Sequence, residues 1–231
     1  PSKKITKHLN FRISGQKIIP TKRTKYLGIH LDEHLSWNFH IDQLKSKLSR
    51  CCGLLAKLRY YASTNLLRTI YFSIFESVMT YGCQIWDQSK NEAPKSIGKV
   101  QEKALRIINF KNKYDRINPI FNMSKILKLQ DQIKINNCLF VFEYMKEMLP
   151  NNFTEHFQSV CNQHNYNTRG SKNRNFCRSS VQTTRYGLNS IKYKATIDWN
   201  NISSTVNIND ESLTKKKLKQ TLTTKVLNSY V

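Results

Sequence analysis

Apolar residues between positions 41 and 58 recur at alternating gaps of three and four, which is the spacing of one face of an α-helix. Ser36 precedes the run and is of the residue type that caps helix N-termini. The pattern predicts an amphipathic helix of about six turns that begins near Ser36. Its predicted core positions are Ile41, Leu44, Leu48, Cys51, Leu55 and Leu58.

Three more helical patterns follow before Pro150. Ser63 or Thr64 is expected to cap the first, Pro94 to open the second and Ser124 to open the third, which Pro150 ends. Residues 36–150 are therefore predicted to form a bundle of helices, with short links that make neighbours antiparallel. The core positions expected on the helix after Ser63 are Leu67, Ile70, Tyr71, Ile74, Val78 and Tyr81.

The segment before this bundle has the pattern of β-structure. Residues 10–13 and 16–19 flank the turn pair Ser14-Gly15, which predicts a hairpin. Residues 24–31 alternate between the two sides of a strand and are expected to form one strand. Three strands alone bury little surface, so residues 1–35 are interpreted as the edge of a larger sheet.

Regular periodicity is lost after Pro150. Residues 156–197 contain no acidic residue but many basic ones, which predicts loops and short strands with a basic surface. Trp199 is expected to anchor a small core, and residues 212–227 to form a last helix. The predicted fold class is mainly α: a short antiparallel β segment at the N-terminus, a helical bundle, then a loop-rich basic C-terminal region with a final helix.

The charge of the chain changes what this fold is expected to bind. Lys and Arg number 38 against 15 Asp and Glu, a formal net charge of +23. So much charge of one sign favours a polyanionic partner, above all RNA or DNA. No apolar run approaches the roughly 20 residues of a membrane span, and no membrane partner is expected.

The first long helix carries basic residues without acidic neighbours. No Asp or Glu lies between Asp42 and Glu76, whereas a merely solvated face mixes both signs. Contact with phosphates is the favoured interpretation, and a solvated face is the alternative. The candidates on this helix are Lys45, Lys47, Arg50, Lys57 and Arg59; those in the C-terminal region are Arg169, Arg174 and Arg178.

Metal-dependent chemistry has weak support. The adjacent acids Asp32-Glu33 and Asp210-Glu211 do not follow an aromatic residue by two positions, and Asp32-Glu33 is better explained as a strand-to-helix turn. A zinc site is the weaker alternative for the cluster Cys161, His164, Cys177 and His156, whose spacing is not that of a standard finger. No catalytic residue and no metal ligand is assigned.

Aromatic residues stand among the basic ones, for example Tyr60-Tyr61, Tyr186 and Tyr193. Such side chains can stack on the bases of single strands, although a place in the core is the simpler explanation for each alone. The six cysteines form no CxxC pair, and reduced thiols in an intracellular protein are expected.

Several short motifs, in order, resemble the reverse transcriptases of non-LTR (LINE-type, jockey-like) retrotransposons. Lys25-Tyr26-Leu27-Gly28 is similar to their primer-grip segment, and Leu35-x-Trp37-x2-His40-Ile41 to the entry of their thumb. A resemblance to the family's post-thumb helices is carried by Tyr81-Gly82, Trp86 and Gln101-x2-Ala104-Leu105-Arg106-Ile107-Ile108. A resemblance to the family's C-terminal region is carried by Tyr166-x-Thr168-Arg169, Gly187-x2-Ser190-Ile191-x-Tyr193 and Trp199-Asn200.

The resemblance implies the C-terminal fragment of an RNA-directed DNA polymerase that copies its RNA at a nicked chromosomal site. Residues 1–35 would end the palm, 36–150 would form the thumb and post-thumb bundle, and 151–231 a basic C-terminal region. Tyr26, Leu27 and Gly28 would position the primer 3′ end, and the basic helix face would hold the template–primer duplex.

The family's endonuclease, fingers and catalytic aromatic-x-Asp-Asp motif are absent from this sequence. Polymerisation by this chain alone is not expected, and Mg²⁺ is expected in the palm of the parent protein rather than here. The palm and fingers are expected partners, and the nucleus and cytoplasm are the expected locations. A free-standing basic RNA- or DNA-binding module and a helical protein-interaction scaffold remain as alternatives.

Overall fold

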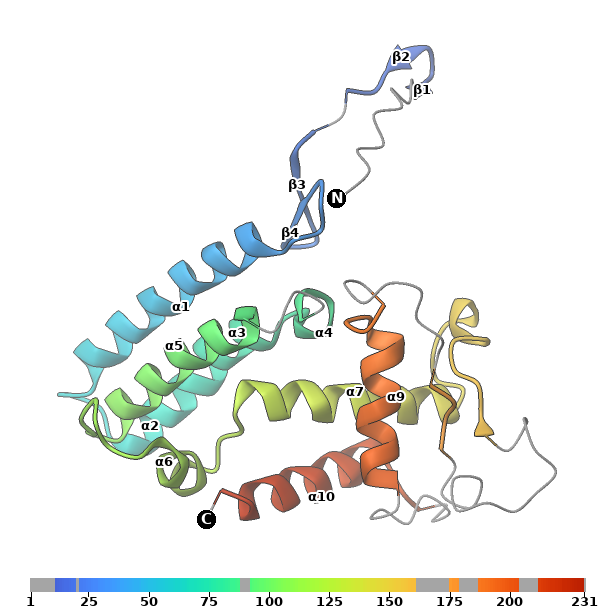
Figure 1. Ribbon diagram of the computed structural model, residues 1–231. Helices are drawn as coiled ribbons and strands as arrows, with labels where there is room; N and C mark the ends of the chain where they lie inside the picture. Colours follow the sequence, from blue (N-terminus) through green and yellow to red (C-terminus); the bar gives the residue numbers. More distant parts are fainter. Residues whose placement is uncertain are drawn as a thin grey trace.

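The computed structural model describes residues 11–19, 21–87, 92–160, 175–178, 187–203 and 212–230. Figure 1 shows two small hairpins that extend from one end of an assembly of helices. The mainly α fold class with an N-terminal antiparallel β segment is confirmed.

The predicted hairpin at Ser14-Gly15 is confirmed. Strands β1 (Arg12–Ile13) and β2 (Gln16–Lys17) pair antiparallel, and both turn residues have positive φ, 49° and 81°. Positive φ at both central positions is the backbone of a type I′ turn, which matches the twist of the strands. All described residues of this hairpin are exposed to solvent.

The single strand predicted over residues 24–31 is wrong. The structure has a second hairpin, in which β3 (Arg23–Tyr26) pairs antiparallel with β4 (Ile29–Asp32). Leu27 and Gly28 form its two-residue turn, with φ of 45° and 81°. The turn escaped prediction because Leu is rare at a positive φ and continues the apolar alternation of the strands.

Helix α1 (Asn38–Leu58) forms where the apolar pattern predicts it, but its start and one core position differ. The N-cap is Trp37, in the left-handed region at φ 65°, and not Ser36. The Ser36 hydroxyl donates to the Asp32 carboxylate at 2.9 Å and accepts only a long hydrogen bond, 3.5 Å, from the Asn38 N–H. Cys52 rather than Cys51 is buried, so the buried positions Leu44, Leu48 and Cys52 follow each other at two consecutive gaps of four residues.

The second predicted helix contains a π-helical turn that changes its buried face. Ser63 caps α2 (Thr64–Ile70), as predicted, by accepting from the Leu66 N–H at 3.3 Å. The π-helix η1 (Tyr71–Glu76) and α3 (Ser77–Thr80) continue the same rod. The buried residues are four apart: Leu67, Tyr71, Phe75 and Met79.

On a regular α-helix, residues four apart would move progressively around the helix axis and would not stay on one face. With 3.6 residues per turn, each step of four rotates by about 40°, and the wider i→i+5 turn absorbs the drift. The expectation that Ile74 and Tyr81 face the core is therefore wrong, because both are exposed. The phase shift cannot be seen in the apolar pattern, since several apolar residues are adjacent there.

The later bundle helices are divided differently from the prediction. Helix α4 (Cys83–Trp86) is one short turn, and α5 (Glu92–Ile108) packs against α1. Ser124 does not open a helix but ends α6 (Ile117–Ser124), after which Lys125 adopts a left-handed conformation at φ 51°. Helix α7 (Leu129–Met145) follows, so one predicted helix start was wrong by about five residues.

The C-terminal region contains more helix than predicted. After η2 (Asn151–Phe153) and an isolated bridge between Ser159 and Phe176, α9 (Ile191–Ile202) forms where loops were expected. Ser190 caps it by accepting from the Tyr193 N–H at 3.3 Å. The buried Trp199 is confirmed, as is the last helix, α10 (Lys215–Asn228), with Leu218 and Leu222 inward.

Helix α7 contributes to two hydrophobic clusters. Leu129 and Ile133 belong to a cluster with α1, α2, η1 and α5, whereas Ile135 and Phe142 belong to one with α9 and α10. Figure 1 shows α9 and α10 against α7. Elements before Pro150 and elements after it thus pack against the same helix, α7. The predicted domain boundaries stay a prediction.

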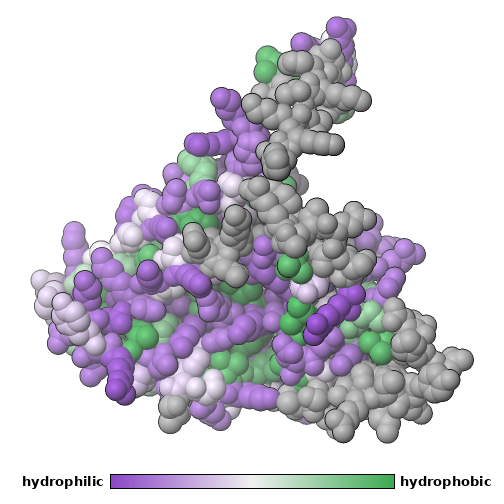
Figure 2. Space-filling model, in the orientation of Figure 1, coloured by the Kyte–Doolittle hydropathy of each residue, from purple (hydrophilic) through white to green (hydrophobic). Residues whose placement is uncertain are grey.

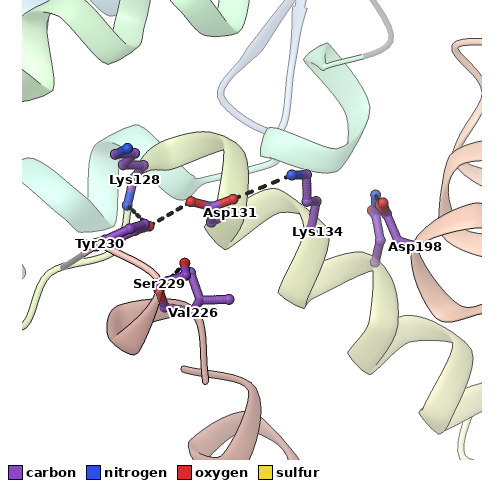
Figure 3. A network of polar contacts seen from close by, with 8 residues as sticks. Lys128, Asp131, Lys134, Asp198, Val226, Ser229 and Tyr230 are labelled. Carbon is purple, nitrogen blue, oxygen red and sulfur yellow. Dashed lines mark hydrogen bonds and ion pairs between the residues drawn. The ribbon is translucent and has the colours of Figure 1, made fainter. Parts of the chain in front are cut away.

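The end of α10 is fastened to the start of α7 by Tyr230. Its hydroxyl donates to Asp131 Oδ2 at 2.6 Å and accepts from the Lys128 N–H at 3.1 Å (Figure 3). Burial raises the pKa of this phenol, and so does the neighbouring carboxylate of Asp131. Tyr230 therefore stays a neutral donor and holds the C-terminal helix in place.

The burial of Glu76 in η1 can be tested through the pH dependence of stability. Burial raises its pKa from an ordinary 4.5 to about 6, against the opposing effect of Lys219 and Arg68. Because the folded pKa is above the unfolded one, native stability falls as pH rises from about 4.5 through about 6. Glu76→Gln is expected to raise the free energy of unfolding by about 2 kcal/mol at pH 8 and to change it little at pH 4.

Urea denaturation at several pH values measures this difference. Glu33→Gln, at an exposed position of the turn before α1, is the matched control and should change little at any pH. A Glu76→Gln effect that is the same at pH 4 and pH 8 would show that the carboxyl does not titrate as described.

Candidate nucleic-acid interface

The tip of the β3–β4 hairpin projects two apolar side chains into solvent. Tyr26 is 66% exposed and Leu27 is 71% exposed, at the end of the hairpin turn. Isolated exposed apolar residues are common, but two of them at a hairpin tip beside a basic helix form a defined contact surface. The structure therefore brings together the three predicted residues Tyr26, Leu27 and Gly28.

A segment some 50 residues further along the chain supports this tip. The Tyr81 hydroxyl donates to the carbonyl oxygen of Leu27 at 2.7 Å. Gly82 has φ 59°, which strains residues other than glycine, and a Cβ there would lie only 2.7 Å from Ile29 Cδ1, so the end of the Ile29 side chain would have to move. The Trp86 indole N–H in turn donates to the carbonyl oxygen of Tyr81 at 3.0 Å. The β3–β4 hairpin is thus held against the helical bundle by these contacts.

Asp32 joins the hairpin to α1. Its carboxylate accepts from the backbone N–H groups of His34 and Ser36 at 3.0 Å each and of Trp37 at 3.1 Å. Burial acts to raise the pKa of Asp32, but these hydrogen bonds outweigh it and hold the pKa below its ordinary value. The predicted turn at Asp32-Glu33 is confirmed, and the Asp32 carboxylate is the group that organises it.

A cavity of about 260 Å³ lies between the hairpin, α1 and α3. His30, His40, Lys47 and Tyr81 are among the residues that line it. His40 is only 7% exposed, and its Nδ1 accepts from the His30 backbone N–H at 3.4 Å, which leaves the proton of a neutral ring on Nε2.

That Nε2 is buried and has no hydrogen-bond partner among the described residues. Burial lowers the pKa of His40, and the nearby His30 and Lys47 lower it further, so the ring is neutral at physiological pH. The cavity wall therefore contains a neutral donor whose hydrogen-bonding capacity is unused, next to the cationic Lys47.

The predicted basic residues of α1 do not share one face. At about 100° per residue, Lys47, Arg50 and Lys57 lie on the side away from the core, and all three are exposed. Lys45 is half-buried at the edge of the helix interface. Among the described residues, Lys45, Lys47 and Arg50 form no ion pair. Figure 2 shows predominantly hydrophilic residues over the visible face of the molecule.

Arg59 lies elsewhere. It is the C-cap of α1, and its guanidinium stacks over the rings of Tyr60 and Phe110. Among the C-terminal candidates, Arg178 is exposed and follows Phe176, which hydrogen-bonds to Asn200 of α9. Arg169 and Arg174 lie outside the described residues.

Sequence reasoning missed the support of this site. The motif Tyr81-Gly82 marks the residues that hold the hairpin, but the apolar pattern had assigned Tyr81 to the core. His40 was part of a motif without a role, and nothing in local sequence indicates that it borders a cavity. A Gly after an apparent helix was the available signal, because such glycines often have a positive φ.

The alternative metal sites gain no support from the described residues. No group of three His, Cys, Asp or Glu side chains in the described part could hold a metal ion. Cys161, His164, Asp210 and Glu211 lie outside it. Within the described residues, no helix is both long enough and apolar enough to cross a membrane.

Two curated proteins of Drosophila melanogaster are similar to the chain. The "Probable RNA-directed DNA polymerase from transposon X-element" is 30% identical over 113 residues, 47% of this chain and 12% of that protein. The "RNA-directed DNA polymerase from mobile element jockey" is 30% identical over 126 residues, 53% of this chain and 14% of that protein. The resemblance to non-LTR reverse transcriptases is thereby confirmed, on a small part of each relative's length. No protein-family model and no solved structure matches the chain.

Proposed function

We propose that this chain is part of a retrotransposon RNA-directed DNA polymerase and that it holds the template–primer duplex during target-primed reverse transcription. The observation that carries the proposal is the β3–β4 tip, which Tyr81 fixes and whose Gly28 lines one cavity with the exposed cation Lys47 of α1. Both similar proteins are named RNA-directed DNA polymerases, which supports the same conclusion.

Each part of the surface has a proposed role. Tyr26, Leu27 and Gly28 contact the primer near its 3′ end, where an exposed ring and an aliphatic side chain can pack on a terminal base. Lys45, Lys47, Arg50 and Lys57 neutralise duplex phosphates, which contributes affinity without sequence preference. Arg169, Arg174 and Arg178 are proposed to extend the nucleic-acid contact from the C-terminal region.

The remaining polymerase parts are the proposed partners. The β1–β2 hairpin exposes Phe11, Ile13 and Ile19, and a small two-stranded sheet gains stability by packing on a larger one. We propose that palm and fingers cover it and supply the carboxylates that bind Mg²⁺. Such a polymerase would act in the nucleus and also occur in the cytoplasm.

The binding of an RNA–DNA duplex with a recessed primer 3′ end tests the proposal. Affinity is expected to be measurable at low salt and to fall steeply as salt rises, because phosphate contacts release counterions. The double variant Tyr26→Ser, Leu27→Asn removes the exposed tip but keeps the turn, since Asn-Gly favours a type I′ turn. We expect it to lower affinity for the recessed end about tenfold and to leave blunt duplex unchanged.

Met148→Gln, at another exposed apolar residue just after α7, is the matched control. Fluorescence anisotropy with labelled duplexes measures all three proteins. Absence of duplex binding at low salt would contradict the proposal and favour a helical interaction scaffold. An equal loss on recessed and blunt duplexes would contradict the primer-end role of the tip.

A further inference from the structure

Four aromatic side chains are exposed at the end of the bundle opposite the hairpins. Tyr60 and Tyr61 follow α1 and are 75% and 91% exposed; Phe110 and Tyr114 follow α5 and are 50% and 92% exposed. A core location, the simpler sequence interpretation for Tyr60-Tyr61, is therefore wrong. Figure 1 shows the end of α1 and the α5–α6 connection at the same end of the molecule.

Arg59 joins the two aromatic groups into one surface. Its guanidinium carbon lies 4.5 Å from the ring centroid of Phe110 and 5.4 Å from that of Tyr60. Both distances are within the range of a cation–π contact. We call this surface the aromatic end; it comprises Arg59, Tyr60, Tyr61, Phe110 and Tyr114.

The backbone beneath the aromatic end is held by hydrogen bonds. The Tyr61 N–H donates to the Leu58 carbonyl at 2.9 Å, and the Lys111 N–H to the Arg106 carbonyl at 2.9 Å. The Asp115 carboxylate accepts from the Asn112 N–H at 2.7 Å, and the backbone carbonyl of Asp115 accepts from the Arg106 guanidinium at 3.4 Å. The rings are thus presented on ordered connections, which lowers the entropy cost of binding.

The charge around the rings is mainly positive. Lys57, Lys111, Lys113 and Arg116 are exposed, and none of them forms an ion pair with a described residue. Asp115, between Tyr114 and Arg116, is the single acidic residue of positions 110–116, and its carboxylate accepts from the Asn112 N–H. The aromatic end therefore offers flat apolar faces together with cations that form no ion pair among the described residues.

We propose that the aromatic end binds single-stranded nucleic acid by stacking bases on Tyr60, Tyr61 and Tyr114. Stacking faces combined with backbone-neutralising cations are the two components of sequence-tolerant single-strand sites. A duplex fits less well, because its bases are stacked on each other and cannot reach the rings. A neutral protein partner would have to desolvate the surrounding cations without compensation.

This site goes beyond the proposed duplex contact, and its rings are separated from the hairpin tip. The rings and the tip lie at opposite ends of α1, whose 21 residues span about 30 Å at 1.5 Å per residue. Lys57 belongs to both proposed surfaces, and substitutions of the three tyrosines leave it unchanged, so the single-strand contact can fail while the duplex contact remains.

The triple variant Tyr60→Ser, Tyr61→Ser, Tyr114→Ser tests the inference without changing charge. Binding to labelled 12-nucleotide poly-U RNA is expected to weaken at least tenfold, and binding to blunt RNA–DNA duplex to change less than twofold. The matched variant Tyr60→Phe, Tyr61→Phe, Tyr114→Phe keeps the stacking faces and should bind poly-U as the unchanged chain does. Far-UV circular dichroism checks that both variants keep their helices, as expected for such exposed positions.

Three outcomes would overturn the inference. Unchanged poly-U binding in the serine variant would show that the rings do not contact bases. An equal loss on poly-U and on duplex would show a general contact rather than a single-strand site. Binding of poly-glutamate that is as tight as poly-U and equally sensitive to the serine variant would identify an acidic protein surface as the partner instead.

Discussion

Replacing Gln101 with alanine is expected to lower the free energy of unfolding by about 3–5 kcal/mol, a large share of the stability of a domain this size. Gln101 is 1% exposed in α5. Its amide donates to the Tyr71 hydroxyl at 2.9 Å and to the Leu127 carbonyl at 2.8 Å, and its oxygen accepts from the Leu129 N–H at 2.9 Å. One side chain thus connects η1, α5 and the start of α7.

The size of the effect comes from what the substitution leaves behind. Each buried group that loses its partner costs about 1–3 kcal/mol, and the missing atoms leave a cavity. Tyr71 cannot reduce the cost by ionising, because burial raises the pKa of its hydroxyl far above the ordinary value. The three groups left unpaired would be the Tyr71 hydroxyl, the Leu127 carbonyl and the Leu129 N–H.

Two further variants separate the polar contribution from the packing one. Gln101→Met keeps most of the volume but forms no comparable hydrogen bonds, so its loss should be about 2–3 kcal/mol. Gln220→Ala, at an exposed position of α10, is the control and should stay within about 0.5 kcal/mol. Urea denaturation measures all three. A loss below about 1 kcal/mol for Gln101→Ala would show that the network does not stabilise the junction.

Neutralising Lys45, Lys47 and Arg50 together to glutamine is expected to weaken duplex binding about 100-fold near 0.1 M salt. Each phosphate contact that is lost should reduce the slope of log affinity against log salt by about one, so the slope should fall by about two to three. Lys45 is half-buried at the helix edge and is expected to contribute least. The loss should be the same for every sequence, because phosphates carry no sequence information.

A control with the same change of net charge makes this prediction specific. Lys146, Lys216 and Lys225 are exposed at the end of α7 and on α10. Their triple glutamine variant should lose less than about threefold, through the weaker long-range field alone. Equal losses in the two triple variants would mean that overall charge, and not the α1 surface, holds the duplex.

The site was only partly predictable, for a reason visible in single residues. Lys47 and Arg50 could be proposed as phosphate contacts because missing acidic neighbours are visible in sequence, and the structure shows that both are exposed. Tyr81 could not be assigned to the hairpin, because its partner Leu27 is 54 positions away. The hairpin turn itself was hidden by a leucine at φ 45°, a conformation that the pairing of β3 with β4 imposes.

The sequence by itself determined the local elements. Apolar spacing specified α1 and α10, capping chemistry specified the start of α2, and Ser14-Gly15 specified the first hairpin. These features depend on neighbours within about one or two turns of helix, or one turn of hairpin, so the information is local.

Only the tertiary structure decided how those elements meet. It placed Cys52 rather than Cys51 in the core, and the π-helical turn η1 lets Phe75 and Met79 join the same hydrophobic cluster. It also brought Arg59 onto Phe110, which creates the aromatic end. Spacing shows that an element has an apolar face, but close packing summed over elements distant in sequence selects what that face contacts.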